Sequence, residues 1–237
     1  MDLKDYQVQG DNMHFWHRAR LGLINYLLSK APTTTNIAAI GCGTGEELSV
    51  LAKHGQVVGY DINRDALALA AKQGLTTAHL NLETEDLPQS FDVITAFDVL
   101  EHLADDNAVF KRLNRGLKPN GYLLLTVPAY QWLFSSHDLA LEHKRRYGKK
   151  ELLQKLSKAN FCVVEIAYWN CCLAPAIIGV RLLKKILPLK IHVSEAKTPP
   201  PILNWLGWQI LSLENSLIRL GCKLPWGISL YAVAKKI

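Results

Sequence analysis

A glycine-rich turn near the start of the chain places the strongest constraint on its fold. Residues 36–46, NIAAIGCGTGE, form an apolar run followed by glycines at 41, 43 and 45. This pattern is typical of a buried strand that turns sharply into a helix, because glycine permits the turn and lets a ligand approach the backbone. Twenty positions after Gly41, Asp61 ends a second apolar run. A carboxylate there can accept ribose hydroxyls, so the spacing predicts an adenosine-containing ligand on a doubly wound α/β sheet.

The residue at position 46 distinguishes ligands that carry a phosphate from ligands that do not. A dinucleotide fingerprint would place a third glycine there, but the residue is Glu46, and no Gly-Lys-Ser/Thr phosphate loop follows. A negative side chain at the start of a helix also opposes a pyrophosphate. A nicotinamide-dependent oxidoreductase is therefore disfavoured, although it is kept as an alternative.

The spacing Gly-x-Gly-x-Gly resembles motif I of the class I S-adenosylmethionine-dependent methyltransferases. Residues 91–103, FDVITAFDVLEHL, and 117–128, LKPNGYLLLTVP, are similar to the fourth strand of that family and the turn into its fifth. The resemblance implies a seven-stranded, mostly parallel sheet with an antiparallel edge, and S-adenosyl-L-methionine as cofactor. Ala39 stands where the family usually has an acidic residue, so a non-catalytic binding protein on this scaffold is a further alternative.

The resemblance also assigns cofactor-binding positions. The turn would lie under the methionine moiety, Asp61 would hold the ribose, and the residues after strands three and four would flank the adenine and the methyl group. The predicted residues are Gly41, Cys42, Gly43, Gly45, Asp61, Ile62, Asn81, Leu82, Phe97, Asp98 and Arg18.

Two further segments resemble a narrower bacterial methyltransferase subfamily. They are HFWHRAR at 14–20 and VPAYQWLFSSHDLALEHKRRYGKKEL at 127–152. In the first segment, Arg18 or Arg20 is expected to reach the carboxylate of the methionine tail. Arg18 is the predicted cofactor-binding residue of the two.

Methyl transfer requires a base only when the acceptor arrives protonated, and histidine suits that task because its pKa is near 6.5. The candidates for catalysis are His102, His137, Asp138, His143 and Arg146. Each candidate could instead have a purely structural role, in packing, in a local turn or on a solvated basic face. Residues 144–146, Lys-Arg-Arg, would alternatively bind an anionic acceptor. A divalent ion could in principle be bound by Glu101, His102, His137, Asp138 and His143. No close pair among them has the spacing of a dedicated metal-binding motif, so no metal is predicted.

Composition favours one globular enzyme domain. The 237 residues are 49% hydrophobic and 20% charged, and the net charge of +6 allows contact with anionic surfaces. The five cysteines have no CxxC spacing, the first residues are polar, and no apolar run is long enough to span a membrane. We therefore expect a cytoplasmic protein, with membrane association open, and no nucleic-acid partner, because its basic residues lack interleaved aromatics.

Strand and helix patterns alternate along the chain, which predicts helices on both faces of a parallel sheet. The expected elements include strands at 91–97, 161–169 and 229–236 and helices at 46–53 and 149–158, and Asn63 is expected to cap the helix after the second strand. We expect a single methyltransferase domain over 1–237, with a helical cap at 1–30 and a helical insertion at 170–228. The insertion is apolar, tryptophan-rich and basic, so a lid, a dimer surface, a membrane contact and a simple extension of the core all remain open. The predicted function is methyl transfer to a small or lipid-linked acceptor, with oxygen as the expected site of methylation, by a monomer or homodimer.

Overall fold

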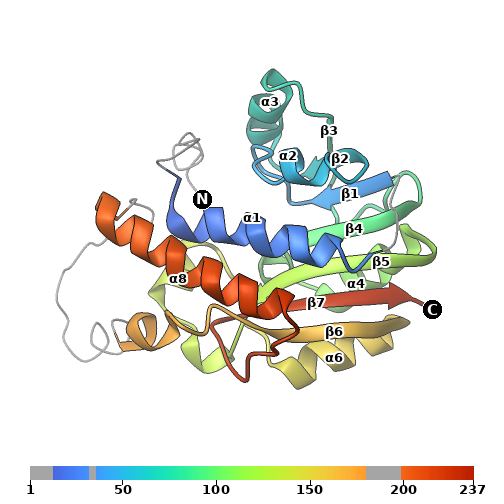
Figure 1. Ribbon diagram of the computed structural model, residues 1–237. Helices are drawn as coiled ribbons and strands as arrows, with labels where there is room; N and C mark the ends of the chain where they lie inside the picture. Colours follow the sequence, from blue (N-terminus) through green and yellow to red (C-terminus); the bar gives the residue numbers. More distant parts are fainter. Residues whose placement is uncertain (1–12, 32–35, 180–198) are drawn as a thin grey trace.

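The computed structural model describes residues 13–31, 36–179 and 199–237, and its centre is a seven-stranded sheet (Figure 1). The strands are β1 (Asn36–Ile40), β2 (Gln56–Asp61), β3 (Thr77–His79), β4 (Phe91–Phe97), β5 (Leu117–Pro128), β6 (Phe161–Trp169) and β7 (Ser229–Lys236). Their order is β3-β2-β1-β4-β5-β7-β6, and only β7 runs antiparallel to its neighbours. The predicted doubly wound, mostly parallel sheet is confirmed.

The helices are α1 (Phe15–Leu28), α2 (Leu48–Leu51), α3 (Arg64–Lys72), α4 (Asp106–Arg115), α5 (Ser136–Ala140), α6 (Lys149–Lys158) and α8 (Pro201–Arg219). Two short 3-10 helices, η2 (Leu100–His102) and η3 (Gln131–Leu133), follow β4 and β5, and residues 174–179 are also helical. Asn63 begins α3 as predicted, because its side chain accepts hydrogen bonds from the first free backbone N–H groups. The helix expected over 46–53 is shorter, since turns occupy the chain up to residue 47.

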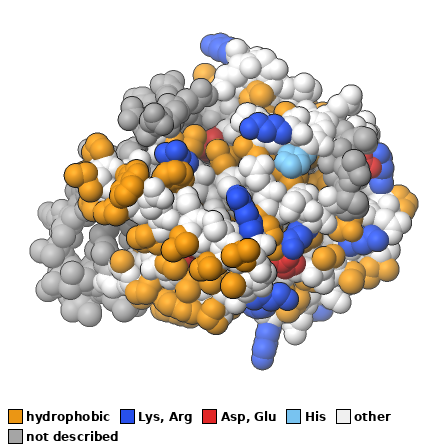
Figure 2. Space-filling model, in the orientation of Figure 1, with side chains coloured by type: hydrophobic (Ala, Val, Ile, Leu, Met, Phe, Trp, Pro, Cys, Tyr) orange, Lys and Arg blue, Asp and Glu red, His pale blue; other side chains and the backbone are white. Residues whose placement is uncertain are grey.

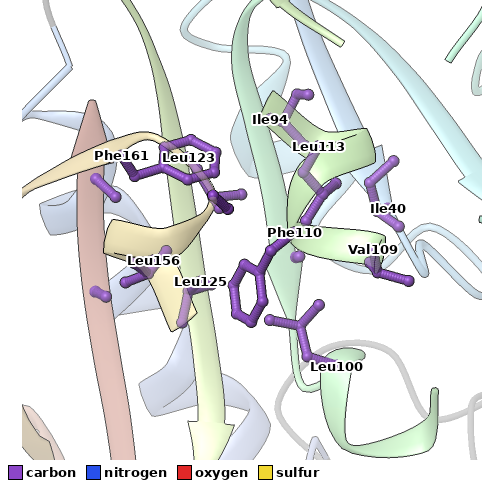
Figure 3. Packing of buried hydrophobic residues seen from close by; sticks show 14 of the residues in the cluster. Ile40, Ile94, Leu100, Val109, Phe110, Leu113, Leu123, Leu125, Leu156 and Phe161 are labelled. Atoms are coloured by element: carbon purple, nitrogen blue, oxygen red, sulfur yellow. The ribbon is translucent and has the colours of Figure 1, made fainter. Parts of the chain in front are cut away.

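The central strands β1, β4 and β7 are buried on both faces. In β1, Ala38 and Ile40 belong to a core with α4 and α6, whereas Ile37 and Ala39 belong to a core with α1, α2 and α8. Figure 3 shows the first of these cores, with Phe110 of α4 among its side chains. Successive strand residues point to opposite faces, which explains why these strands read as continuous apolar runs.

The strand register brings three functional segments to one edge of the sheet. Ile40 at the end of β1 is paired with Tyr60 of β2 on one side and Ala96 of β4 on the other. Gly41, Asp61 and Asp98 therefore leave the sheet at the same edge. This is the carboxyl edge of the parallel strands. The neighbours β2 and β4 lie on opposite sides of β1, and open α/β sheets form their ligand crevice at such a point.

The long connection between β6 and β7 packs on the body of the domain through α8, which lies alongside α1 (Figure 1). The Asn204 side chain bonds the backbone at both Met13 and Phe15, near the start of α1. Asn215 bonds Ala19 in α1 and the indole N–H of Trp169 at the end of β6. These contacts fix α8 to the first helix and to the sheet.

The basic residues Arg181, Lys184, Lys185 and Lys190, which the sequence places in the same connection, lie outside the described residues. None of the helices in the described ranges combines the length and the apolar character needed to cross a bilayer.

Candidate active site

The glycine turn after β1 has a backbone conformation that favours glycine, and packing excludes a side chain at Gly41 and Gly45. Gly41, Gly43 and Gly45 have φ angles of +69°, +51° and +89°, in the region that favours glycine. A Cβ on Gly41 would lie 2.4 Å from Val99 Cγ2, and one on Gly45 would lie 2.3 Å from Leu75 Cδ1. The N–H groups of Gly41, Cys42, Gly43 and Gly45 already donate to Tyr60, Asp61 and Cys42, so the turn is held by its own hydrogen bonds. Without side chains, the glycines of the turn would let a ligand approach the backbone closely.

Asp61 lies beside this turn and is half-buried. Its Oδ2 accepts the Gly43 N–H at 2.8 Å, and its Oδ1 accepts the Asn63 N–H at 2.8 Å. Because an ionised carboxylate has about four acceptor positions, two bonds leave capacity for the paired hydroxyls of a ribose. The turn and Asp61 thus fit a nucleoside without phosphate.

Cys42 is arranged differently from the glycines around it. Its side chain is buried, and the space beside Gly59 of β2 is filled by its sulfur. Burial raises the pKa of the Cys42 thiol to about 12. Only the backbone of Cys42 is placed to contact a ligand.

The remaining predicted nucleoside contacts lie near the same sheet edge. Ile62 is 60% exposed and can form an apolar wall. The Asn81 side-chain oxygen accepts the Glu83 N–H at 3.0 Å. Leu82 and Phe97 are buried in the two cores, so their side chains support the crevice from behind.

Arg20, and not Arg18, reaches the crevice from α1. Its Nη1 donates to Asp98 Oδ2 at 3.0 Å, and its Nη2 lies 3.7 Å from Glu47 Oε2. Asp98 turns toward it from β4 with a φ of +56°. The guanidinium of Arg18 instead lies 3.7 Å from the ring centroid of Trp208 in α8. The structure therefore favours Arg20 over the predicted Arg18, because residues two apart on a helix point in very different directions.

Two acidic residues follow the glycine turn. Glu46 Oε2 lies 3.1 Å from His17 Nδ1 of α1. Glu47 is buried, and burial raises the pKa of its carboxyl to about 7 although Arg20 opposes the shift. This acidic surrounding is unsuited to a pyrophosphate, as position 46 predicts.

A second group of side chains gathers on η2, directly after β4. Glu101, His102 and His143 hold one ligand-type atom each within 4.8 Å of one another. Burial and the adjacent Asp98 carboxylate raise the pKa of Glu101 well above its usual range. Burial, together with the neighbouring His143, lowers the pKa of His102 to about 4, so this imidazole is neutral at pH 7.

Asp138 orients this group from α5. Its Oδ1 accepts from His143 Nδ1 at 3.1 Å and from Arg146 Nε at 2.7 Å. Its Oδ2 accepts both the N–H and the hydroxyl of Ser135, which closes the first turn of α5. Hydrogen bonds from His143 and Arg146 hold the pKa of Asp138 below its usual range despite burial. His137 lies on α5 as well, but the cluster around Glu101 does not include it.

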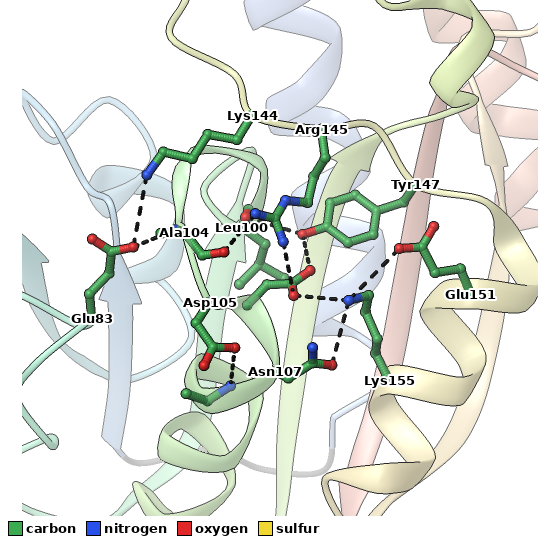
Figure 4. A network of polar contacts seen from close by, with 12 residues as sticks. Glu83, Leu100, Ala104, Asp105, Asn107, Lys144, Arg145, Tyr147, Glu151 and Lys155 are labelled. Carbon is green, nitrogen blue, oxygen red and sulfur yellow. Dashed lines mark hydrogen bonds and ion pairs between the residues drawn. The ribbon is translucent and has the colours of Figure 1, made fainter.

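The basic segment at 144–147 is used for ion pairs and buried hydrogen bonds. Arg145 pairs with Asp106 at 3.1 Å, and the Tyr147 hydroxyl donates to Asp106 at 2.8 Å. Lys144 lies 4.0 Å from Glu83 (Figure 4). Each cation of this segment faces a carboxylate of the protein; Arg145 and Arg146 face buried ones, and Lys144 stays exposed. Arg146 is a positioning residue, because its guanidinium donates to Asp138 and to the Ala129 carbonyl, and its backbone N–H donates to the Gln131 side chain.

Comparison with known proteins agrees with this geometry. Residues 38–123 match a family model described as "Methyltransferase domain". A ubiquinone biosynthesis O-methyltransferase of Aliivibrio fischeri is 28% identical over 114 residues, which cover 44% of this chain and 49% of that protein. The enzyme of the same description from Methylococcus capsulatus is 36% identical over 91 residues, which cover 35% of this chain and 38% of that protein. The chain thus spans at most about half the length of these curated relatives.

Among solved structures, an S-adenosylmethionine-dependent methyltransferase from Mesorhizobium loti superposes with a TM-score of 0.61. It is 18% identical and covers 89% of this chain and 96% of its own. At this identity the likeness concerns the fold. The family model spans the glycine turn, Asp61 and the η2 cluster residues Glu101 and His102, and the sheet order is that of the solved methyltransferase. Residues 38–123 thus match a methyltransferase domain, and the chain has the class I methyltransferase fold.

Proposed function

We propose that this chain transfers a methyl group from S-adenosylmethionine to a hydroxyl oxygen of a small hydrophobic or lipid-linked acceptor. The observation that carries the proposal is the open glycine turn joined to Asp61, with acidic residues where a phosphate-binding site would have free amides. The curated relatives described above are O-methyltransferases by name, which favours oxygen as the attacked atom.

The donor would be held by residues that meet at the carboxyl edge of β1, β2 and β4. The backbone of the turn would lie under the methionine moiety, and Asp61 would accept the ribose hydroxyls. Ile62 and Asn81 would flank the adenine. Arg20 and Asp98 carry the opposite charges that suit the carboxylate and ammonium of an amino acid.

When bound, the donor supplies a methyl group already activated by a sulfonium. The protein's task is then mainly orientation, and holding two reactants in place can contribute about 7 to 11 kcal/mol. His102 and His143 are the groups of the η2 cluster suited to receive the acceptor proton, and Asp138 and Arg146 position His143.

The exposed face of α8 supports a hydrophobic acceptor. Ile202, Leu203, Trp205 and Leu213 are 74%, 57%, 54% and 64% exposed. Figure 2 shows hydrophobic side chains gathered over this helix. This helix packs on α1, which supplies Arg20. We propose that α8 contacts the acceptor or the membrane that contains it.

Replacement of Asp61 tests the donor site. We expect Asp61→Ala to weaken binding of S-adenosylhomocysteine about 10- to 100-fold, because hydrogen bonds to a charged group contribute about 1.5 to 3 kcal/mol. Isothermal titration calorimetry measures the affinity. Asp65→Ala, which removes an exposed carboxylate from the first turn of α3, is the matched control and should bind as the wild type does.

Equal affinity of the Asp61→Ala and Asp65→Ala variants would remove Asp61 from the ribose site. A rise in melting temperature with NADH, without one for S-adenosylhomocysteine, would replace the proposal by the oxidoreductase alternative. No rise with either ligand would favour a non-catalytic binding protein.

A further inference from the structure

We propose that Glu101, His102 and His143 bind one divalent transition-metal ion, and that this ion holds the hydroxyl oxygen of the methyl acceptor. The binding site stands on the geometry of the η2 cluster alone. The role of the ion in catalysis rests on the proposed function.

The first argument is the environment of Glu101. Its side chain is 0% exposed, and neither carboxylate oxygen has a hydrogen-bond partner within the described part of the chain. A buried carboxylate in that condition is costly unless it is protonated or bound by a cation. The nearest cationic candidate, His143, holds its Nε2 3.9 Å from Glu101 Oε1, too far for a hydrogen bond.

The second argument is convergence. The rings of His102 and His143 meet edge to face, with centroids 4.7 Å apart. One nitrogen of each, and one Glu101 oxygen, lie within 4.8 Å of one another. Metal–ligand bonds of about 2.0 to 2.2 Å would need only small side-chain movements to join these atoms. Two imidazoles with one carboxylate suit Zn²⁺, Mn²⁺ or Co²⁺ better than Mg²⁺ or Ca²⁺.

The third argument is the support behind the ligands. His143 directs its Nδ1 to Asp138 at 3.1 Å, which leaves Nε2 toward Glu101. A carboxylate behind a ligating histidine is the usual arrangement at protein metal sites, because it fixes the ring and its tautomer. Arg146 holds Asp138 in turn, and the Lys144 N–H donates to the Glu101 carbonyl at 2.8 Å. The two chain segments that carry the ligands are thus joined directly.

The fourth argument is position. Val99, two residues before Glu101, packs against Gly41 of the glycine turn, and Asp98 precedes it in the donor crevice. Three protein ligands leave a coordination position open, as in catalytic zinc sites. An acceptor hydroxyl bound there would become more acidic. Because His102 and His143 are ligands when the ion is present, the proton would then pass to water, and these imidazoles would receive it only in metal-free protein. As its oxygen forms a bond to the methyl carbon, the bond from that carbon to sulfur breaks and S-adenosylhomocysteine leaves. No oxidation or reduction is involved.

Cobalt titration tests the site without reference to activity. Protein dialysed against a chelator should bind one equivalent of Co²⁺, give visible ligand-field absorption bands and release the ion to Zn²⁺. Glu101→Gln and His102→Ala should each weaken Co²⁺ binding by more than the roughly 10- to 100-fold typical of losing an outer-shell partner. Two matched variants, Glu142→Gln at an exposed carboxylate and His54→Ala beyond α2, should bind Co²⁺ as the wild type does.

Binding of S-adenosylhomocysteine by each variant shows that it is folded with an intact donor site. Wild-type protein that binds no Co²⁺, or ligand variants that bind it equally well, would overturn the metal site. Co²⁺ binding together with unchanged methyl transfer by metal-free protein would overturn the role in acceptor activation alone. Co²⁺ binding without affinity for S-adenosylhomocysteine would contradict the proposed function and leave the metal site standing.

Discussion

At the scale of single residues, Glu47 connects the donor crevice to the pH dependence of stability. Its folded-state pKa is raised by burial to about 7, whereas the ordinary value is 4.5. The folded protein therefore binds more protons than the unfolded chain between these values, and stability falls as pH rises through that range. Between pH 4.5 and 7, the free energy of unfolding of the wild type should fall by up to about 2 to 3 kcal/mol because of Glu47, and Glu47→Gln should abolish this fall. Urea unfolding at a series of pH values measures it.

Glu142→Gln, at an exposed acid, should leave the pH profile unchanged. Identical slopes for wild type and Glu47→Gln between pH 4.5 and 7 would mean that Arg20 compensates the burial of Glu47 fully.

The sequence predicts residues whose role follows from the backbone and misses those whose role depends on side-chain direction. Gly41 and Asp61 lie at the same edge of the sheet, as predicted, because strand endings and spacing determine that position. Arg20 could have been preferred to Arg18, since it lies four residues before Ile24 and seven before Leu27, on the face that is buried. His143 lies far from Glu101 in the sequence, and the fold brings the two side chains together. The spacing of these residues in the sequence therefore does not predict the cluster.

At the scale of elements, α8 depends on one buried amide. Asn215 accepts from the Trp169 indole N–H at 2.9 Å and donates to the Ala19 carbonyl at 2.8 Å. We expect Asn215→Leu to destabilise the protein by about 2 to 4 kcal/mol, because both partners would be buried without a hydrogen bond. Chemical denaturation followed by tryptophan fluorescence measures the change.

Ser216→Ala, which removes an exposed hydroxyl from the next position of α8, should alter stability by less than about 0.5 kcal/mol. Equal stability of the two variants would show that apolar packing alone fixes α8.

Most elements follow from hydrophobic periodicity. The strands β4, β6 and β7 occupy the predicted residues, and α6 does as well. The exception is α2, where three glycines with positive φ delay the helix. The arrangement of α8 on α1 was not predictable, because amphipathic pattern identifies an apolar face without identifying what it contacts.

At the scale of the whole molecule, the exposed apolar face of α8 predicts binding to anionic vesicles. The net charge of +6 provides attraction, and insertion of apolar side chains provides affinity. We expect Leu203→Glu combined with Leu213→Glu to reduce co-sedimentation with anionic liposomes at least about 10-fold, since two charges would enter the interface.

The matched control places the same charges elsewhere on the surface, with Leu139→Glu on α5 and Val164→Glu on β6, at 65% and 52% exposure. If this control loses as much liposome binding as the α8 variant, net charge governs the interaction and α8 has no special part in it.

The position of β7 has a consequence for biosynthesis. β7 lies between β5 and β6, although about sixty residues separate it from β6 in the sequence. A nascent chain that has left the ribosome as far as β6 therefore has two unpaired strand edges where β7 will insert. Completion of the sheet must wait for translation of residues 229–236. Ribosome-bound chains arrested before this point should accordingly be recognised by chaperones.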